Sequence, residues 1–184
     1  ADVSGIDFRD CIIATGSRVN VIPPAKNIPV WTSREALELR EVPERLLVIG
    51  AGYIGLELGL VYAGLGSQVT MVEFSSRVLG AADEDLVDIM VKHCESRLHE
   101  IRYDSKVTAI EQKGDDFLVT VEHKGETQQL ETDRVLMAVG RQPNSENLGL
   151  EKVNIQPNSR GFIPVDEEGR TSAEHIYAIG DVTP

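Results

Sequence analysis

The strongest constraint on the fold is a glycine-rich turn between an apolar strand and an apolar helix. The turn has the sequence Gly50-Ala51-Gly52-Tyr53-Ile54-Gly55 and directly follows the continuous apolar run Leu46–Ile49. An acidic residue, Glu73, ends the next apolar run about 20 residues downstream, the spacing found in dinucleotide-binding βαβ units. A glycine turn without a ligand remains an alternative for the turn alone. The strand, the helix and the acid together favour nucleotide binding.

Each glycine of this turn has a separate role in a dinucleotide-binding unit. Gly50 permits the tight turn, Gly52 leaves room for a pyrophosphate, and Gly55 lets the helix lie against the sheet. The amino terminus of the helix offers free N–H groups and a partial positive charge to the phosphates. The sequence therefore predicts a pyrophosphate site at residues 50–55.

The acid at residue 73 predicts which coenzyme is bound. A Glu73 carboxylate can accept hydrogen bonds from both ribose hydroxyls of NAD, whereas NADP would bring a phosphate to the same place. Two like charges about 4 Å apart repel by roughly 4 kcal/mol at an effective dielectric constant near 20. Arg77, the one basic residue nearby, is interpreted as a solvated loop arginine. We therefore expect NAD rather than NADP.

The order of apolar patterns predicts an α/β fold: a Rossmann-like parallel sheet with an inserted small antiparallel β-meander. Strands at 46–49, 69–73 and 135–139 alternate with helices, and the second helix begins at the acidic residues 83–85. The buried stripe predicted for that second helix consists of Leu86, Ile89, Met90 and Leu98. The meander is predicted from three short strands with glycine-centred links between them, at 106–111, 117–123 and 127–131.

The segments before the central α/β pattern are predicted to be mostly extended. Residues 10–14 predict a buried strand, the proline-rich residues 19–29 a non-helical crossover, and Thr32 or Ser33 the cap of a short helix through Leu39. The predicted division is 1–40 for the end of a first flanking domain segment and a crossover, 41–140 for the NAD-binding domain, and 141–184 for a return segment.

Composition excludes several classes of function. The 18 basic and 30 acidic residues give a net charge of −12, which disfavours nucleic acid and anionic membranes as partners. The segment 46–66 is long and apolar enough to suggest a membrane span, but its glycines favour a strand, a turn and a buried helix. Two cysteines in no paired motif and four histidines without ligand spacing predict no metal site and a cytoplasmic location. No signal peptide is expected at the start of the sequence.

Several motifs together resemble the flavoprotein pyridine nucleotide-disulfide oxidoreductases. They are the run Cys11–Ser17, the run Val48–Gly59, Val72-Glu73-Phe74, Gly140-Arg141-Gln142-Pro143-Asn144, and the stretch from Gly161 to Val182. Residues 147–151 and the Gly-Asp-Val at 180–182 are most similar to the dihydrolipoamide dehydrogenase subfamily, while mercuric reductases, glutathione reductases and NADH oxidases share much of the pattern.

The resemblance implies that this chain is the central part of a longer FAD- and NAD-dependent enzyme. In that family an NAD domain is inserted into a FAD domain, and a dimerisation domain follows. The amino-terminal FAD motif, the redox-active cysteine pair and the carboxy-terminal histidine of the family are missing from this sequence, so we expect the chain alone to be inactive. The parent enzyme is expected to be a homodimer within a 2-oxoacid dehydrogenase complex.

The resemblance also assigns binding residues, and no catalytic residue. Glu73 would hold the adenosine ribose, Val107 would border the adenine and Gly140 would close the pocket. Thr15, Gly16 and Asp181 would contact FAD. The residues implied along the pyrophosphate and the nicotinamide are Gly50, Ala51, Gly52, Tyr53, Ile54, Gly55, Leu56 and Glu57.

Two of these assignments keep alternatives. Glu57 is an acid within an apolar helix, so it either faces an open cleft or pairs with a neighbouring cation, and the alternative for Tyr53 is a packing residue. For the whole chain, the alternatives are another NAD(P)H-dependent flavoprotein disulfide reductase, similar to mercuric reductase or NADH oxidase, and a free-standing NAD-binding module.

Overall fold

A computed structural model describes residues 5–80 and 82–184. The chain forms two compact units, one from Val19–Gly140 and one from Ala1–Arg18 with Arg141–Pro184. The division expected from the sequence placed residues 19–40 outside the central domain. In the structure they pack with it, since Trp31 pairs with Leu136 and the Tyr62 hydroxyl donates to the Ala36 carbonyl.

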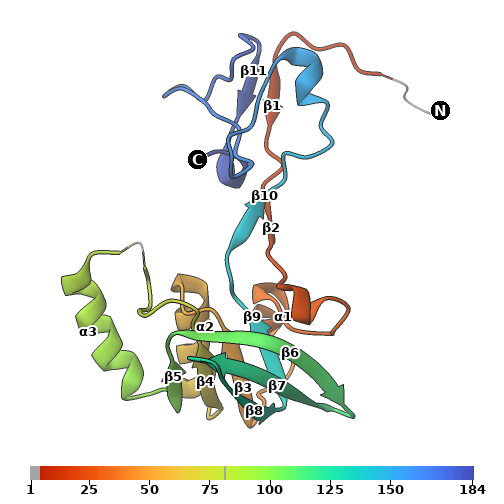
Figure 1. Ribbon diagram of the computed structural model, residues 1–184. Helices are drawn as coiled ribbons and strands as arrows, with labels where there is room; N and C mark the ends of the chain where they lie inside the picture. Colours follow the sequence, from red (N-terminus) through yellow and green to blue (C-terminus); the bar gives the residue numbers. More distant parts are fainter. Residues whose placement is uncertain (1–4, 81) are drawn as a thin grey trace. The chain divides into compact units, whose positions relative to one another are not determined.

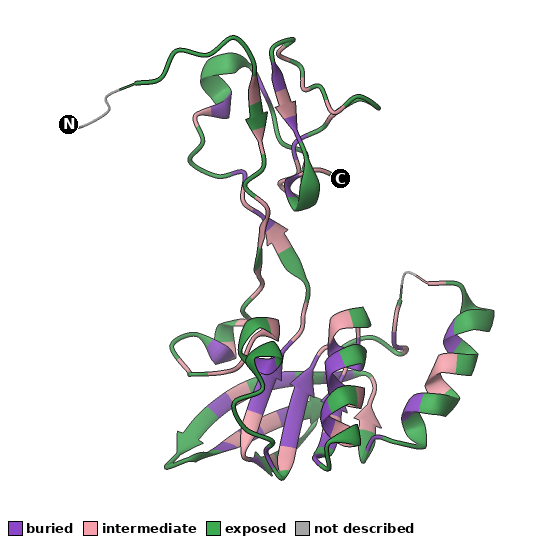
Figure 2. Cartoon of the chain, turned by 180° about the vertical axis from the view of Figure 1, so that it is seen from behind, coloured by how far each residue is buried: buried purple, intermediate pink, exposed green. Residues whose placement is uncertain are grey.

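A four-stranded parallel sheet forms the centre of the Val19–Gly140 unit, as predicted. Its strands lie in the order β5 (Glu100–Arg102), β4 (Gln68–Val72), β3 (Arg45–Ile49) and β9 (Arg134–Met137). All three pairings are parallel, and β3 and β9 are buried over most of their length (Figure 2). The sequence analysis did not find β5, because three residues are too short to show a period.

Helices cover one face of this sheet and the meander covers the other (Figure 1). Alternate residues of β3 point to opposite faces, so Leu46 and Val48 pack against the helices while Leu47 and Ile49 pack against the meander. The meander is antiparallel with the order β6 (Ser105–Lys113), β7 (Asp116–His123) and β8 (Glu126–Thr132). The predicted fold class is therefore confirmed.

Three α-helices belong to this unit: α1 (Ser33–Glu38), α2 (Tyr53–Gly64) and α3 (Glu84–Glu95). Thr32 caps α1 as predicted, because its hydroxyl accepts from the Arg34 N–H while the Glu35 carboxylate accepts from the Thr32 N–H. The apolar segment that suggested a membrane span is resolved into β3, the glycine turn and α2. Within the described residues, no helix is long and apolar enough to cross a membrane.

The buried stripe predicted for α3 is wrong at two of its four residues. Leu86 and Ile89 are 61% and 70% exposed, whereas Val87 and Cys94 are buried. Met90 and Leu98 do pack against the core, as predicted. The apolar residues of α3 lie on two neighbouring faces, so the sequence period alone did not show which face meets the sheet.

In the second unit, short strands from the first 19 residues pair with short strands from the last 44 residues. β1 (Cys11–Ile13) runs parallel to β11 (Ile176–Ala178), and β2 (Ser17–Val19) pairs with β10 (Arg141–Pro143). The strand predicted to be buried at 10–14 is only half-buried, with Ile12 61% exposed. Two 3₁₀ turns, Leu150–Val153 and Gly180–Val182, also belong to this unit. A third, Pro23–Ala25, belongs to the Val19–Gly140 unit and lies in the crossover predicted to be non-helical.

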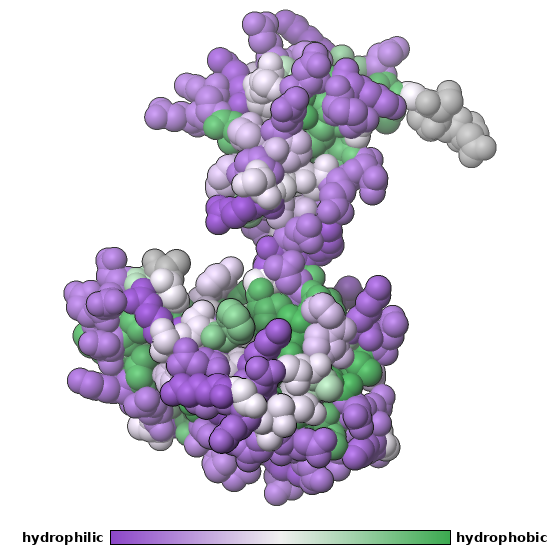
Figure 3. All heavy atoms as spheres, in the orientation of Figure 1, coloured by the Kyte–Doolittle hydropathy of each residue, from purple (hydrophilic) through white to green (hydrophobic). Residues whose placement is uncertain are grey.

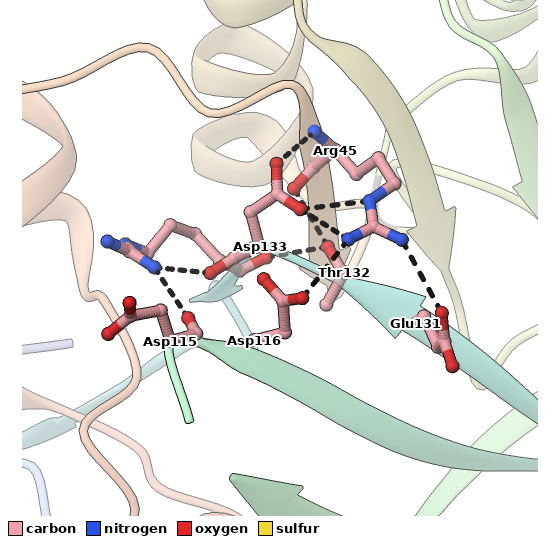
Figure 4. Close-up of polar contacts among 7 residues, drawn as sticks. Arg45, Asp115, Asp116, Glu131, Thr132 and Asp133 are labelled. Carbon is pink, nitrogen blue, oxygen red and sulfur yellow. Dashed lines mark hydrogen bonds and ion pairs between the residues drawn. The ribbon is translucent and has the colours of Figure 1, made fainter. Parts of the chain in front are cut away.

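A charge cluster holds the starts of β3 and β9 together (Figure 4). The Asp133 carboxylate accepts from the backbone N–H of Arg45 at 2.9 Å and from its guanidinium at 2.9 and 2.6 Å. Asp116 and Glu131 lie farther from the same guanidinium, at 3.6 and 3.7 Å. Burial opposes ionisation of Asp133, but the bonds from Arg45 outweigh it and lower the pKa of Asp133 below its ordinary value.

We expect Asp133→Asn to lower the free energy of unfolding at pH 7 by about 1–2 kcal/mol, because it removes charge-assisted bonds to a partly buried arginine. Since the folded state lowers this pKa, the stabilisation is present above the unfolded value of about 3.9 and is lost as the pH falls through the folded value. Urea unfolding at pH 7 and at pH 3 measures both effects.

The matched control for this prediction is Asp116→Asn. Its carboxylate is 57% exposed and 3.6 Å from Arg45, so its loss should cost less than about 0.5 kcal/mol. Equal costs for the two variants, or a difference between wild type and Asp133→Asn that does not shrink at low pH, would contradict the prediction.

Candidate functional site

The candidate site is a pocket of about 830 Å³ at the carboxyl ends of the parallel strands. Three strand ends supply its floor: residues 50–52 after β3, residues 73–75 after β4 and residues 138–140 after β9. Ligands of open parallel sheets bind at this edge, and cofactor sites have volumes of about 300–1,000 Å³. The space-filling view shows apolar and near-neutral side chains gathered on the upper part of the Val19–Gly140 unit, above a hydrophilic lower edge (Figure 3).

Two glycines of the turn are required by close packing. Gly50 has φ +98°, and a Cβ atom there would lie 2.5 Å from the Ala138 carbonyl oxygen. A Cβ at Gly55 would overlap the Gly50 carbonyl and lie 3.3 Å from the Ala138 side chain. These contacts place the first turn of α2 directly against the ends of β3 and β9.

Gly52 differs from both, because a Cβ there would meet nothing within 4 Å and its φ of −75° suits any residue. The fold therefore does not need a glycine at this position. Gly52 lines the pocket and is the N-cap of α2, where no side chain caps the helix. The open space in front of Gly52 and the unpaired N–H groups of the first helical turn fit a pyrophosphate.

Glu73 is held in place by the backbone on both sides of the pocket. One carboxylate oxygen accepts from the Ala51 N–H of the glycine turn at 2.7 Å, and the other accepts from the Ser75 N–H at 2.8 Å. Each carboxylate oxygen has a second lone pair that these bonds leave available. The group can therefore accept two further hydrogen bonds from neighbouring hydroxyls, which fits the diol of a ribose.

The residues named from the sequence are only partly brought together. Gly50, Ala51, Gly52, Glu73, Val107 and Gly140 line this pocket, whereas Tyr53, Ile54, Gly55, Leu56 and Glu57 do not. The Leu56 side chain is buried in the core at 1% exposure, while Tyr53 is 65% exposed. Glu57 is exposed and makes no ion pair with any described residue.

Thr15, Gly16 and Asp181 lie in the other unit, where Thr15 and Asp181 are each bonded to a residue distant in the sequence. The Thr15 hydroxyl donates to the Asn144 carbonyl at 2.7 Å, and Gly16 has φ +68° with open space around it. The Asp181 carboxylate accepts from the Ser17 hydroxyl at 2.7 Å. These residues therefore surround the ends of β1 and β11 and leave room for a ligand contact at Gly16.

Sequence reasoning missed several residues that line the pocket. Pro23 and Pro24 come from the crossover, Phe74 follows Glu73 with 73% of its surface exposed, and Leu79 and Gly80 come from the loop before α3. Phe74 could have been found from its position beside the strand end. The others are brought in by the path of loops, which no periodic pattern encodes. No group of three or more metal-binding side chains occurs among the described residues.

The parallel sheet, the close-packed glycine turn and the acid after β4 define a Rossmann-type α/β domain. The sequence profile of the pyridine nucleotide-disulphide oxidoreductases matches residues 2–184. The chain belongs to this family.

Two similar proteins are both named dihydrolipoyl dehydrogenase. The chain is 43% identical to a dihydrolipoyl dehydrogenase of Haemophilus influenzae and 42% identical to one of Haloferax volcanii, in each case over 96% of this chain. It spans 37% and 38% of the length of these two relatives. The resemblance inferred from the motifs is confirmed.

Two solved structures share this fold. The flavoprotein disulfide reductase RclA from Escherichia coli matches with a TM-score of 0.84 at 34% identity, over 95% of this chain and 40% of that one. LpdA from Mycobacterium tuberculosis matches with a TM-score of 0.82 at 31% identity, over 94% of this chain and 37% of that one.

We expect Gly52→Val to abolish NAD binding while the chain stays folded, because the added side chain enters the pocket in front of α2, where its Cβ has no protein atom within 4 Å. Calorimetric titration with NAD, on protein with unchanged circular dichroism, measures this effect. Gly64→Val is the control, since Gly64 lies on the same helix in open space and lines no part of the pocket. Unchanged affinity in the Gly52 variant would remove the pyrophosphate assignment.

Proposed function

We propose that this chain is the NAD(H)-binding portion of a flavin-dependent dihydrolipoamide dehydrogenase and serves hydride transfer between FAD and NAD. The observation that carries the proposal is the Glu73 carboxylate, held by the Ala51 and Ser75 N–H groups beside the open space at Gly52. The names of the sequence relatives support the choice of enzyme. Because the chain spans less than two-fifths of those relatives, activity and substrate are proposed for the parent protein.

In this proposal the protein binds and orients the coenzyme. The first N–H groups of α2 bind the pyrophosphate, and Glu73 accepts the adenosine ribose hydroxyls. Val107, 5% exposed on β6, borders the adenine, and Gly140 closes the pocket between the end of β9 and β10. The nicotinamide, when bound, accepts a hydride from reduced flavin. No side chain of this chain is required to take part in that transfer.

The remaining assignments lie outside this pocket. Tyr53 and Glu57, both exposed, are proposed to face the nicotinamide end of the coenzyme. Thr15, Gly16 and Asp181 are proposed to contact FAD, with Asp181 bonding the sugar-alcohol chain of the flavin. The parent is proposed to act as a homodimer within a 2-oxoacid dehydrogenase complex and in the cytoplasm.

A second candidate is a flavoprotein disulfide reductase with another substrate, and the similarity to RclA favours keeping it. Both candidates use the pocket in the same way, so they differ only in the disulfide substrate. The activity of the parent protein with dihydrolipoamide distinguishes them: reduction of NAD supports the first candidate and its absence supports the second.

We expect Glu73→Gln to weaken NAD binding by about 1–3 kcal/mol, because glutamine offers one acceptor oxygen where the carboxylate offers two. NADP affinity should rise or stay level, since the charge that repels a 2′-phosphate is gone. The measurement is a pair of dissociation constants for the two coenzymes at fixed, moderate salt.

Glu111→Gln is the control for the change in net charge. Glu111 is exposed on β6 and lines no part of the pocket, so both dissociation constants should stay as in the wild type. If Glu73→Gln leaves the ratio of NAD to NADP affinity unchanged, the ribose assignment is wrong.

A further inference from the structure

One wall of the pocket is formed by residues 75–80, the wall segment, which follows β4 and Phe74. Ser75, Arg77, Leu79 and Gly80 line the pocket, while Val78 is fully buried and packs against the core. The wall segment is thus anchored at its middle residue. The positions of Leu79 and Gly80 beyond this anchor must be fixed by other contacts.

Leu79 connects the wall segment to the glycine turn. Its backbone N–H donates to the Ala51 carbonyl at 3.1 Å. Leu79 makes this bond with φ +48°, in the left-handed region that a leucine adopts only when its surroundings enforce it. The contact between the wall segment and the turn therefore depends on a strained residue, and some neighbouring group must offset the strain.

Arg77 is placed to hold this conformation. One guanidinium nitrogen donates to the Gly80 carbonyl at 2.8 Å and to the Ala82 carbonyl at 3.0 Å, and another lies 2.9 Å from the Glu84 carboxylate. The Arg77 side chain is 35% exposed, whereas Glu84 is 86% exposed and its ion pair is screened by water. The bonded carbonyls belong to Gly80 and Ala82, one and three residues after Leu79, so these bonds are the contacts that fix the backbone.

The expectation from the sequence that Arg77 is a solvated loop arginine holds only in part, because the side chain lies in a loop and is 35% exposed but is bonded to neighbouring groups. Its bonding partners are the Gly80 and Ala82 carbonyls of its own loop and the Glu84 carboxylate in the first turn of α3. The planar guanidinium can donate to carbonyls in two directions at once, which an ammonium group on a flexible stem does less well.

We propose that Arg77 is a positioning residue for the coenzyme pocket: it holds Leu79 in its left-handed conformation and so keeps the wall segment against the glycine turn. The inference rests on the proposed NAD-binding function. Without Arg77, Leu79 relaxes, the bond to Ala51 opens, and the pocket must be rebuilt each time the coenzyme binds. The loss appears as weaker affinity rather than as unfolding of the domain.

The test compares Arg77→Lys and Arg77→Gln in calorimetric titrations of the 184-residue chain with NAD. If Arg77 acts by position, both variants bind NAD about tenfold more weakly than the wild type, which corresponds to about 1.4 kcal/mol. If Arg77 only supplied positive charge, the lysine variant would bind as the wild type does, and that result would overturn the proposal. If the glutamine variant fails to fold, the lysine variant, which keeps the charge, still tests the proposal.

A second substitution tests the strain itself. Asparagine tolerates the left-handed region better than leucine, so Leu79→Asn combined with Arg77→Lys should recover at least about half of the lost binding free energy. A merely structural role of Arg77 predicts no such rescue. If Leu79→Asn does not recover binding, the proposal is overturned. Arg102→Gln is the control: Arg102 is also ion-paired and partly buried, on β5, but lines no part of the pocket.

The outcomes separate this inference from the function on which it rests. A wild-type chain that does not bind NAD overturns the proposed function and this inference with it. A wild-type chain that binds NAD, with Arg77→Lys of equal affinity, overturns the inference alone. Faster amide hydrogen exchange at Leu79 in Arg77→Lys than in the wild type supports the inference independently of the coenzyme, and equal exchange contradicts it.

Discussion

The close approach of the glycine turn to the end of β9 is the contact on which the pocket depends. Gly50 and Gly55 both face Ala138, and a Cβ at either glycine would collide with backbone atoms. Only this packing brings the amino terminus of α2 to the carboxyl edge of the sheet, where its free N–H groups face the pocket. Gly52, between them, has no such neighbour, so the protein fold needs two glycines of the turn, and the proposed pyrophosphate contact would account for the third.

Glu73 extends this arrangement from the turn to the next strand. Its carboxylate joins the Ala51 N–H to the Ser75 N–H, and the Leu79 N–H returns to the Ala51 carbonyl. Both backbone groups of Ala51 are therefore bonded to the chain after β4. The turn and that chain form one hydrogen-bonded unit, so the geometry of the proposed ribose site and that of the proposed pyrophosphate site are set together.

The parts of the fold that follow a periodic pattern could be predicted from the sequence. The apolar run of β3, the glycine turn and the alternation along β6 and β7 each encode their own structure. The buried face of α3 could not be predicted, because Leu86 and Val87 are both apolar and only tertiary packing selects Val87. The proposed role of Arg77 was missed for a related reason. Two of its partners are backbone carbonyls, and because every residue has a carbonyl, the sequence does not show which of them accept a bond.

The electrostatics of the pocket show why local geometry must outweigh net charge. The chain carries a net charge of −12, so its overall field repels an anionic dinucleotide. The charged residues that line the pocket are Glu73, Arg77 and Lys106: Arg77 is bonded to Glu84 and to loop carbonyls, and Lys106 is exposed on β6. In the proposed function, the aligned N–H groups at the start of α2, which act over only a few ångströms, bind the phosphates, and Lys106 adds a positive charge to the pocket. Because so short a range tolerates little displacement, a binding site of this kind needs its walls fixed before the ligand arrives, and the glycine packing, the Glu73 bonds and the Arg77 contacts all fix them.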